Sequence, residues 1–449
     1  MQTITELKAW KVAAPDGCAL ANRDGGHEPY FRRTVVVARD NQDRIGLAEI
    51  PGILGMDELI QSPRVQAVVV GRPVIQLRSI VDELDGLVGG DEGSDRGNKT
   101  WDSDLGRHLK SGVEVSVGDL LAQREAVPLA DLFGKRRRSA CPVNAYGFWH
   151  FDPAGTGIEY LPPKGTKGWD YWRAAPAMTV PRLVELFGAL LAFTGAKSLK
   201  LKGGVFDPQT EVQAMLALKE AYPGIRLTLD PNGCWDVATS VWVLNELKGV
   251  IDYVEDPTWG LENLASVQKT VPTRIATNMA VTRFKHVKPA LQAGLDLIVL
   301  ADPQFWGGIA AALEVARLCS ASGWGLGCHS NNHQGIAMMT TATLGVLVDD
   351  SILYDFDTHY PYSRQQYEVV DNPPLIRGGA VEVSDVPGLG LRLNWDRLAA
   401  AHKLALSLPN QSRNDATFME KKYPGWKANP RQWALKGYEE RLQSVSVQR

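Results

Sequence analysis

The sequence predicts an α/β protein, a (β/α) barrel preceded by a small α+β domain. Two observations lead to this prediction. From about residue 140, short β-rich runs alternate with segments of helical length, whereas the earlier residues show strand-like stretches followed by helical ones. Alternation of strand and helix indicates parallel strands with crossover helices, and eight such repeats favour a closed barrel over an open sheet.

The N-terminal domain is predicted to span residues 1–138. Its strand candidates are TELKAWKV, TVVVARD and RIGLAEI, and its helix candidate is VEVSVGDLLAQREA. A Gly/Asp-rich run at 89–104 has too few apolar side chains to pack on its own. Such a run is usually a surface loop, and a lid over a binding site is the more specific interpretation. The basic run KRRRS at 135–139 is interpreted as a solvated linker.

The barrel is predicted to span residues 139–380. Its strand candidates, in chain order, are VNAYGF, KSLKLKG, RLTLDPNG, IDYVEDP, TRIATNM, LDLIVLADP, WGLGCHS and LYDFDTH. A β-hairpin signal, GGAVEVSDVPGLGLRLNW, introduces the C-terminal segment, residues 381–449, which continues into helix. We expect this segment to pack back on the N-terminal domain and the barrel.

Composition and charge exclude several classes of function. Apolar residues make up 44% of the chain and charged residues 22%, as in a globular protein. The formal net charge of −3 does not indicate a nucleic-acid partner. Five scattered cysteines indicate reduced thiols and a cytoplasmic location. We expect no secretory signal, because the N-terminus shows no basic region followed by an apolar core, and no membrane span, because no apolar run is long enough.

A polar side chain stands at the end of most predicted barrel strands, where the active sites of such barrels lie. In chain order these residues are Lys200, Lys202, Asp230, Glu255, Asn278, Asp302 and His329. From Lys202 onward they are separated by 28, 25, 23, 24 and 27 positions, each about one βα repeat. We therefore expect all of them to converge on one pocket.

The middle of this series suits a metal ion. Asp230, Glu255 and Asn278 offer oxygen ligands from adjacent strands. Hard oxygen ligands that leave room for water and substrate favour Mg²⁺.

The two ends of the series suit acid–base chemistry. Lys200 and Lys202 alternate along one strand, so both should face the barrel interior, and their mutual repulsion favours a neutral lysine that can act as a base. Asp302 lies one repeat before His329, and a carboxylate beside an imidazole fixes its tautomer. A metal flanked by two bases suits removal of a proton α to a carboxylate.

Taken singly, each of these residues has an ordinary structural explanation. An aspartate at a strand end is more often a helix N-cap than a ligand, and Asp302, which precedes Pro303, is the clearest case. A single strand lysine is usually solvated, a single histidine usually makes structural contacts, and Asn278 alone indicates little. The functional interpretation depends on the whole set falling at strand ends in one register.

The motifs around these residues resemble those of the enolase superfamily, and within it the glucarate dehydratase group. They are KLKGG (200–204), LDPNG (229–233), EDP (255–257), ATNM (276–279), ADPQFW (301–306) and HSNNH (329–333). HSNNH is the most specific of them. The resemblance extends over nearly the whole chain.

This resemblance implies a modified (β/α)7β TIM-type barrel whose mouth is covered by the α+β N-terminal capping domain. It also implies a Mg²⁺-dependent hydro-lyase that converts a six-carbon aldarate, D-glucarate or L-idarate, to 5-dehydro-4-deoxy-D-glucarate. Lys200 would bind the reacting carboxylate, Lys202 and His329 would be the acid/base groups, and Asp302 would orient His329. A homo-oligomer is expected by resemblance alone.

The resemblance further implies a set of substrate-binding residues outside the strand-end series. These are Asn22, His27, Thr100, Tyr146, Phe148, Asn232, Ser330, Asn331, His359 and Arg413. A dicarboxylate needs a cationic or hydrogen-bonding clamp at the end that is remote from the metal, and His27 and Arg413 can supply it.

Several alternatives stay open. The segment between Glu255 and Asn278 is shorter than is typical of the group, so Glu262 is a second candidate for the acidic ligand; Glu255 is preferred because it ends its strand directly. The substrate could be another acid sugar, such as galactarate or talarate, in a dehydration or an epimerisation. A catalytically weak paralogue with a binding role would lack a base or a ligand, and none is missing.

Overall fold

The computed structural model describes residues 2–85, 87, 105–165, 167–409 and 413–438. Thr100 and the predicted lid at 89–104 lie outside the described residues. The chain forms two compact units: unit 1 comprises residues 1–14, 31–143 and 299–412, and unit 2 comprises residues 15–30, 144–298 and 413–449. The domain limits 1–138, 139–380 and 381–449 stay a prediction.

Unit 1 contains a three-stranded sheet in the order β1-β4-β5, with β4 and β5 antiparallel. Its strands are β1 (Ile4–Pro15), β4 (Tyr30–Asp40) and β5 (Ile45–Pro51), and its early helices are α1 (Met56–Ile60), α2 (Pro63–Val69), α3 (Leu77–Leu84), α4 (Leu105–Glu125) and α5 (Leu129–Phe133). The valine run of β4 is buried, and β-branched side chains suit a strand. Helix α4 packs against β5. At Gly46 a Cβ atom would lie 1.9 Å from the Ser116 carbonyl oxygen, so glycine permits this close approach.

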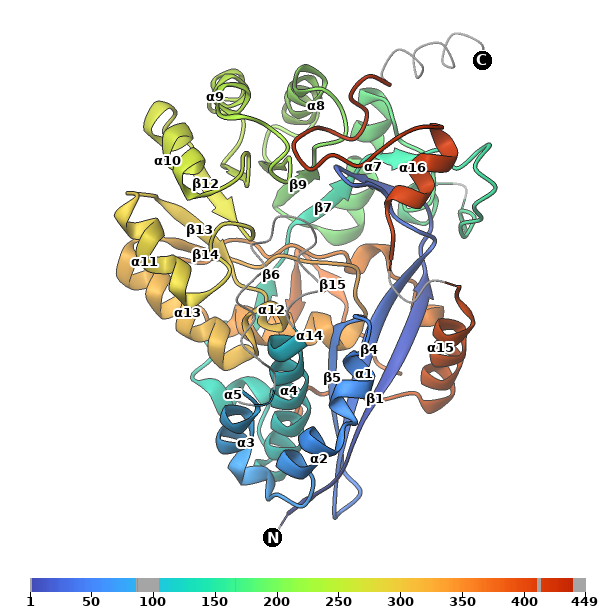
Figure 1. The fold of residues 1–449 in the computed structure, drawn as a ribbon, viewed down its shortest axis with the longest axis vertical. Helices are drawn as coiled ribbons and strands as arrows, with labels where there is room; N and C mark the ends of the chain where they lie inside the picture. Colours follow the sequence, from blue (N-terminus) through green and yellow to red (C-terminus); the bar gives the residue numbers. More distant parts are fainter. Residues whose placement is uncertain (1, 86, 88–104, 166, 410–412, 439–449) are drawn as a thin grey trace. The chain divides into compact units, whose positions relative to one another are not determined.

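Unit 2 contains five parallel strands in the order β7-β9-β10-β11-β12. They are β7 (Ala145–Phe148), β9 (Ser198–Lys202), β10 (Arg226–Asp230), β11 (Tyr253–Glu255) and β12 (Arg274–Thr277). Helices follow them in turn: α6 (Trp169–Trp172), α7 (Val180–Thr194), α8 (Pro208–Ala221), α9 (Val237–Glu246), α10 (Leu261–Thr270) and α11 (Phe284–Gln292). Figure 1 shows α8, α9 and α10 next to one another outside the strands.

The sheet continues through β13 (Leu297–Leu300) to β14 (Gly325–Gly327). The predicted eighth strand pairs on both sides within unit 1. Leu353 bridges Leu326 of β14 in parallel, and Phe356 bridges Val143, just before β7, also in parallel. Each of the eight strand candidates therefore takes its predicted place, and the eighth closes the barrel.

Shorter elements complete the two units. In unit 2, β2 (Ala19–Asn22), β3 (Gly25–Gly26) and β8 (His150–Phe151) form a small sheet, and α16 (Ala416–Lys422) packs on β3. In unit 1, a short hairpin forms from β15 (Ile376–Arg377) and β16 (Ala380–Glu382), which joins β6 (Ala140–Pro142). This hairpin turns at the start of the predicted hairpin signal, before Ala380, and Leu393 in the second arm of that signal bridges Val370 instead. Unit 1 also contains α12 (Pro303–Trp306), α13 (Ile309–Ser322), α14 (Gly335–Leu347) and α15 (Trp395–Ser407).

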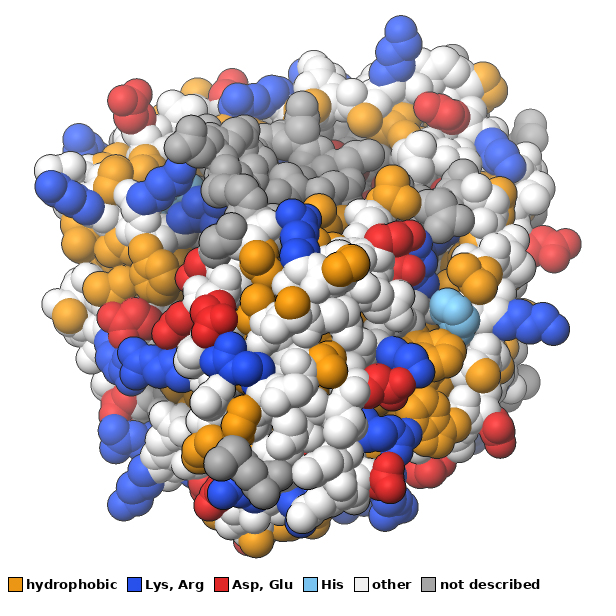
Figure 2. All heavy atoms as spheres, turned by 60° about the horizontal axis from the view of Figure 1, so that its bottom comes forward, with side chains coloured by type: hydrophobic (Ala, Val, Ile, Leu, Met, Phe, Trp, Pro, Cys, Tyr) orange, Lys and Arg blue, Asp and Glu red, His pale blue; other side chains and the backbone are white. Residues whose placement is uncertain are grey.

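The cysteines and the charged surface residues have the following environments in the structure. All five cysteines are buried, and none of them forms a disulfide. The basic run at 135–139 borders a hollow of about 840 Å³, where Arg136 pairs with Asp131 and Asp385 and Arg138 pairs with Asp350. Figure 2 shows basic and acidic side chains interspersed on the face that it draws. Within the described ranges, no helix has the length and apolarity to cross a membrane.

Candidate active site

Five of the predicted strand-end residues meet in unit 2. The parallel register places Lys202 opposite Asp230, one strand away. The Nζ atom of Lys202 donates to Asp230 Oδ2 at 2.6 Å, and the Nζ atom of Lys200 lies 3.6 Å from the same oxygen. Lys200 also donates to Glu255, and Asn278 Nδ2 donates to Glu255 Oε1 at 2.8 Å. All five side chains are buried.

This cluster fits a divalent cation. The carboxylates of Asp230 and Glu255 already converge on one ammonium group, that of Lys200. Burial alone would raise the pKa of the Asp230 carboxyl, but Lys202 and Lys200 outweigh it and hold that pKa below its usual range, so the carboxylate is charged. Within the described part of the chain, no group of three His, Cys, Asp or Glu side chains is placed to hold a metal ion. An oxygen donor set here would combine the two carboxylates with the amide oxygen of Asn278.

Asp256 supports this cluster, although we did not predict a role for it. Its Oδ1 accepts the Thr277 hydroxyl at 2.5 Å, and its Oδ2 accepts the backbone N–H groups of Asn278 at 2.9 Å and Met279 at 3.1 Å. The residue has φ of 38°, a left-handed conformation that is uncommon outside glycine. Asp256 therefore fixes the backbone from which Asn278 projects. The position of Asp256 in the EDP motif, directly after Glu255, is the feature of the sequence that could have indicated this supporting role.

Aromatic rings from β7 line the same cluster. Lys200 Nζ lies 4.6 Å from the centre of the Tyr146 ring, a cation–π geometry. The rings of Tyr146 and Phe148 are 4.7 Å apart, and Phe148 in turn is 5.9 Å from the imidazole of His27. Both aromatic side chains are buried. Tyr146, Phe148 and His27 thus form one continuous wall that starts at Lys200.

Three residues of the predicted substrate-binding set, Asn22, His27 and Arg413, lie together in unit 2, and Asp415 joins them. Arg413 pairs with this carboxylate through Nε at 2.7 Å and Nη2 at 3.1 Å, and Asn22 Nδ2 donates to it at 2.9 Å. Arg413 Nη1 lies 3.5 Å from His27 Nδ1. Burial lowers the pKa of His27 well below its usual range, and the Arg413 cation lowers it further. His27 is therefore a neutral hydrogen-bonding group here, not the cationic one that the sequence allowed.

Asn232, the remaining predicted binding residue of unit 2, lies in the turn after β10. It has φ of 57°, and its N–H donates to Asp230 Oδ1 at 2.9 Å. Its carbonyl oxygen accepts from Arg23 at 2.5 Å, and the guanidinium carbon of Arg23 lies 5.0 Å from the centre of the Trp259 ring. Asn232 thus contributes a rigid turn next to Asp230, held by a cation–π contact that the sequence did not reveal.

The predicted second acid–base pair belongs to unit 1. Asp302 follows β13 and caps α12, since its Oδ1 accepts the Gln304 N–H at 2.7 Å. The ordinary explanation, a helix cap, therefore holds for one of its oxygens. His329 follows β14, is 8% exposed, and makes an edge-on ring contact with Phe305 at 5.7 Å. That Asp302 orients His329 stays a proposal.

The rest of the HSNNH segment is bound to the eighth strand. Ser330 Oγ accepts the N–H of His359 at 3.0 Å and lies 3.3 Å from its Nδ1. Asn331, the partly exposed neighbour, offers its carbonyl oxygen to the Ser330 hydroxyl at 3.0 Å. His333, which the motif contains but which we assigned no role, lies 3.2 Å from Thr358 Oγ1 through Nε2. The segment that carries His329 is thus held at several points.

The family described as "Enolase C-terminal domain-like" matches residues 182–397. A probable glucarate dehydratase from Streptomyces coelicolor is 35% identical over 438 residues, which cover 94% of this chain and 97% of that protein. The chain belongs to the enolase superfamily. Its predicted membership is confirmed, and the enzyme is of the lyase type, a dehydratase.

Other members of the superfamily extend this picture. The crystal structure of a Pseudomonas fluorescens protein with bound magnesium, potassium and tartrate is 31% identical, covers 96% of this chain and 99% of its own, and has a TM-score of 0.87. The barrel and the N-terminal domain are therefore confirmed, and Mg²⁺ is the metal of the family. The L-talarate/galactarate dehydratase of Salmonella typhimurium is 23% identical over 63% of each chain. Together these relatives support an acid-sugar dehydratase as the general description.

Glu262, the alternative acidic ligand, is exposed in the first turn of α10, whereas Glu255 is buried beside Lys200 and Asn278. We expect Glu262→Ala to leave dehydration close to wild type, because its carboxylate is solvated. Glu255→Ala should reduce activity strongly, on the order of 10³-fold, since several kcal/mol of charge stabilisation would be lost. Steady-state rates at saturating Mg²⁺ compare the two. A strong loss in the Glu262 variant would reverse the assignment.

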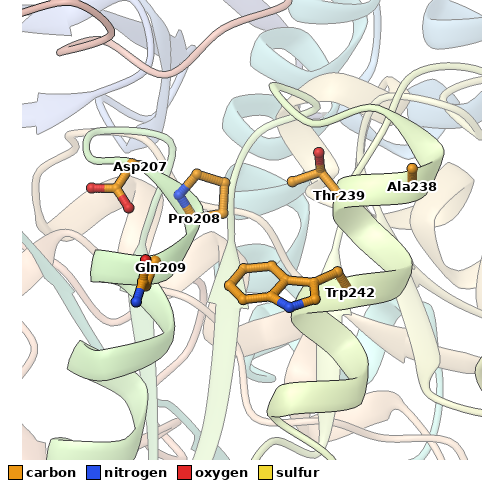
Figure 3. Close-up of a pocket in the computed structure, with 6 residues that line it drawn as sticks. All are labelled: Asp207, Pro208, Gln209, Ala238, Thr239 and Trp242. Atoms are coloured by element: carbon orange, nitrogen blue, oxygen red, sulfur yellow. The ribbon is translucent and has the colours of Figure 1, made fainter.

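A shallow hollow of about 390 Å³ lies elsewhere in unit 2, between the first turns of α8 and α9 (Figure 3). Its lining includes Asp207, Pro208 and Trp242, and none of the predicted site residues. The Asp207 carboxylate caps α8 by accepting the Thr210 N–H at 3.1 Å. The Asp207 side chain is thus engaged in helix capping.

Proposed function

We propose that this enzyme dehydrates a six-carbon aldarate, D-glucarate and L-idarate in particular, to 5-dehydro-4-deoxy-D-glucarate. The observation that carries the proposal is the convergence of Asp230 and Glu255 on Lys200, with Asn278 beside them. The 35% identity to a probable glucarate dehydratase supports the same substrate class.

Asp230, Glu255 and Asn278 would hold Mg²⁺. When bound, the metal supplies positive charge next to the substrate carboxylate whose α-carbon loses its proton. Lys200 binds that carboxylate, because its ammonium group is buried among the same oxygens and faces the Tyr146 ring.

Lys202 and His329 remove or return the α-proton, each for one configuration of the carbon. His329 also protonates the departing β-hydroxyl, so the elimination yields water and an enol that becomes the 2-keto acid. Asp302 orients the His329 ring. A base has to lie within hydrogen-bond reach of its proton, so the geometry of these side chains sets the rate.

The far end of the substrate binds at the clamp. Arg413 supplies the positive charge, and neutral His27 and Asn22 supply hydrogen bonds. Asp415 occupies two donors of Arg413, which orients the guanidinium. Tyr146 and Phe148 form the wall between the two ends. The proposed binding residues also include Asn232, Ser330, Asn331, His359 and Thr100. A cytoplasmic location and a homo-oligomer are further parts of the proposal.

The second candidate is another acid-sugar activity, and the similarity to an L-talarate/galactarate dehydratase favours it. A screen of aldarates for 2-keto acid formation with Mg²⁺ distinguishes the two. We expect D-glucarate and L-idarate to react fastest. Faster turnover of galactarate or talarate would assign the second activity, and no turnover of any aldarate would contradict the substrate class.

A further inference from the structure

Two charged side chains of the N-terminal sheet form a buried ion pair in unit 1. Arg33 lies on β4 and Glu49 on β5. The Arg33 Nε atom is 2.8 Å from Glu49 Oε1, and the side chains are 3% and 0% exposed. Taking two charges out of water costs several kcal/mol per ion, and an apolar pair of similar volume is often at least as stable. The stability of the sheet alone therefore does not explain the pair.

The Glu49 carboxylate holds the beginning of helix α14. Its Oε1 accepts the N–H of Gln334 at 2.8 Å, and its Oε2 accepts the N–H of Ala337 at 2.9 Å. The first N–H groups of a helix have no partner within the helix, and Gln334, the N-cap, makes no side-chain capping bond. A carboxylate at this end also interacts favourably with the helix dipole. Because α14 begins directly after residues 329–333, Glu49 fixes the end of the segment that carries His329.

The Arg33 guanidinium extends this connection to the preceding strand end. Its Nη2 donates to Oε1 of Gln304 in α12, and the Gln304 N–H donates to Asp302 Oδ1 at 2.7 Å. One planar guanidinium thus joins Glu49 and Gln304, which a lysine ammonium does not reproduce. The segments after β13 and β14 are therefore tied to each other through two strands of the N-terminal sheet.

We propose that Arg33 and Glu49 are positioning residues that set the geometry of Asp302 and His329. The inference rests on the proposed function, in which His329 is one of two bases. The other base, Lys202, ends β9 in unit 2, where Asp230 holds its ammonium group. A misplacement of about 1 Å can cost on the order of 10²-fold in rate. Disturbing the Arg33–Glu49 pair should therefore slow proton transfer at His329 and not at Lys202.

Two variants test this inference. Glu49→Gln replaces one accepting oxygen by an NH₂ group, which does not accept an N–H of α14. Gln304→Ala leaves the ion pair intact and removes the link between Arg33 and the Asp302 segment. Exchange of the substrate α-proton with D₂O is measured with D-glucarate and with L-idarate, at saturating Mg²⁺. We expect each variant to lose about 10²-fold in exchange with D-glucarate and to retain exchange with L-idarate near the wild-type rate.

Asp119→Asn is the matched control. Asp119 is also a buried carboxylate of unit 1, and it accepts the N–H groups of Leu47 and Leu389, both at 2.9 Å, which lie outside the site. This variant should unfold at a lower temperature without separating the two exchange rates. If it separated them as well, the selectivity would not come from the Arg33–Glu49 pair.

Two further outcomes distinguish the inference from the proposed function. Equal losses with both epimers, in folded Glu49→Gln and Gln304→Ala proteins that bind Mg²⁺, would overturn the positioning role. A His329→Asn protein that still exchanged the D-glucarate proton would instead contradict the assignment of the base itself.

Discussion

Asp230→Ala is expected to abolish dehydration. The Asp230 side chain is fully buried, and its Oδ2 lies 2.6 Å from Lys202 and 3.6 Å from Lys200. Its removal takes away one of the two carboxylates that we propose as metal ligands and leaves two buried ammonium groups with the carboxylate of Glu255. The loss of charge stabilisation corresponds to a rate reduction on the order of 10³-fold or more. Calorimetric titration with Mg²⁺ should show weaker binding in parallel.

Two controls separate this effect from unfolding. Removing one partner of a buried ion pair typically costs about 3–5 kcal/mol, so Asp230→Asn, which keeps the shape, is measured alongside. Asp236 lies in the same βα repeat and caps α9 by accepting the Thr239 N–H at 2.7 Å. Asp236→Ala should cost about 1 kcal/mol of stability and leave the activity intact. Chelation should abolish activity reversibly, and full activity in excess chelator would exclude the metal.

His329→Asn and Lys202→Ala should affect the two epimers in opposite ways. D-Glucarate and L-idarate differ in configuration at one α-carbon, so under the proposed function each presents its proton to a different base. We expect His329→Asn to lose D₂O exchange with D-glucarate and to keep some with L-idarate, and Lys202→Ala to do the reverse. Each loss should be on the order of 10²–10⁴-fold, the usual contribution of a general acid–base group.

Dehydration of both epimers can fall in the histidine variant, because His329 is also proposed to protonate the departing hydroxyl. Exchange is therefore the decisive measurement. If both variants lost exchange equally with both epimers while still binding Mg²⁺, the assignment of one base to each configuration would be wrong.

The sequence predicted the barrel and the strand-end cluster because both depend on local patterns. A strand of a parallel barrel is apolar until its last residues, so a polar side chain at its end is visible without any structure. The repeat length then places Lys202, Asp230, Glu255 and Asn278 on adjacent strands. The structure adds the register, in which Lys202 lies opposite Asp230 and donates to it.

Local sequence patterns could not predict how Asp415 orients Arg413, nor the Arg33–Glu49 pair. Asn22 and Asp415 meet across 393 positions of the chain, so no spacing in the sequence indicates that Asp415 would orient Arg413. The neutral state of His27 depends on burial and on Arg413, neither of which a linear pattern contains. In the sequence, Glu49 is an ordinary residue of a predicted strand. Only the structure shows that its carboxylate accepts N–H groups at the start of α14.

The division of the chain into interleaved units has a consequence for how the protein is made. Unit 1 combines residues 31–143 with residues 299–412. Val143, in the first segment, pairs with Phe356, which is synthesised more than 200 residues later. During synthesis, the first part of the chain leaves the ribosome long before its partners exist. High contact order of this kind slows folding and prolongs the exposure of apolar strands to aggregation. Nascent chains that stop before residue 299 should therefore depend on chaperones, and their protease resistance should appear late and in one step.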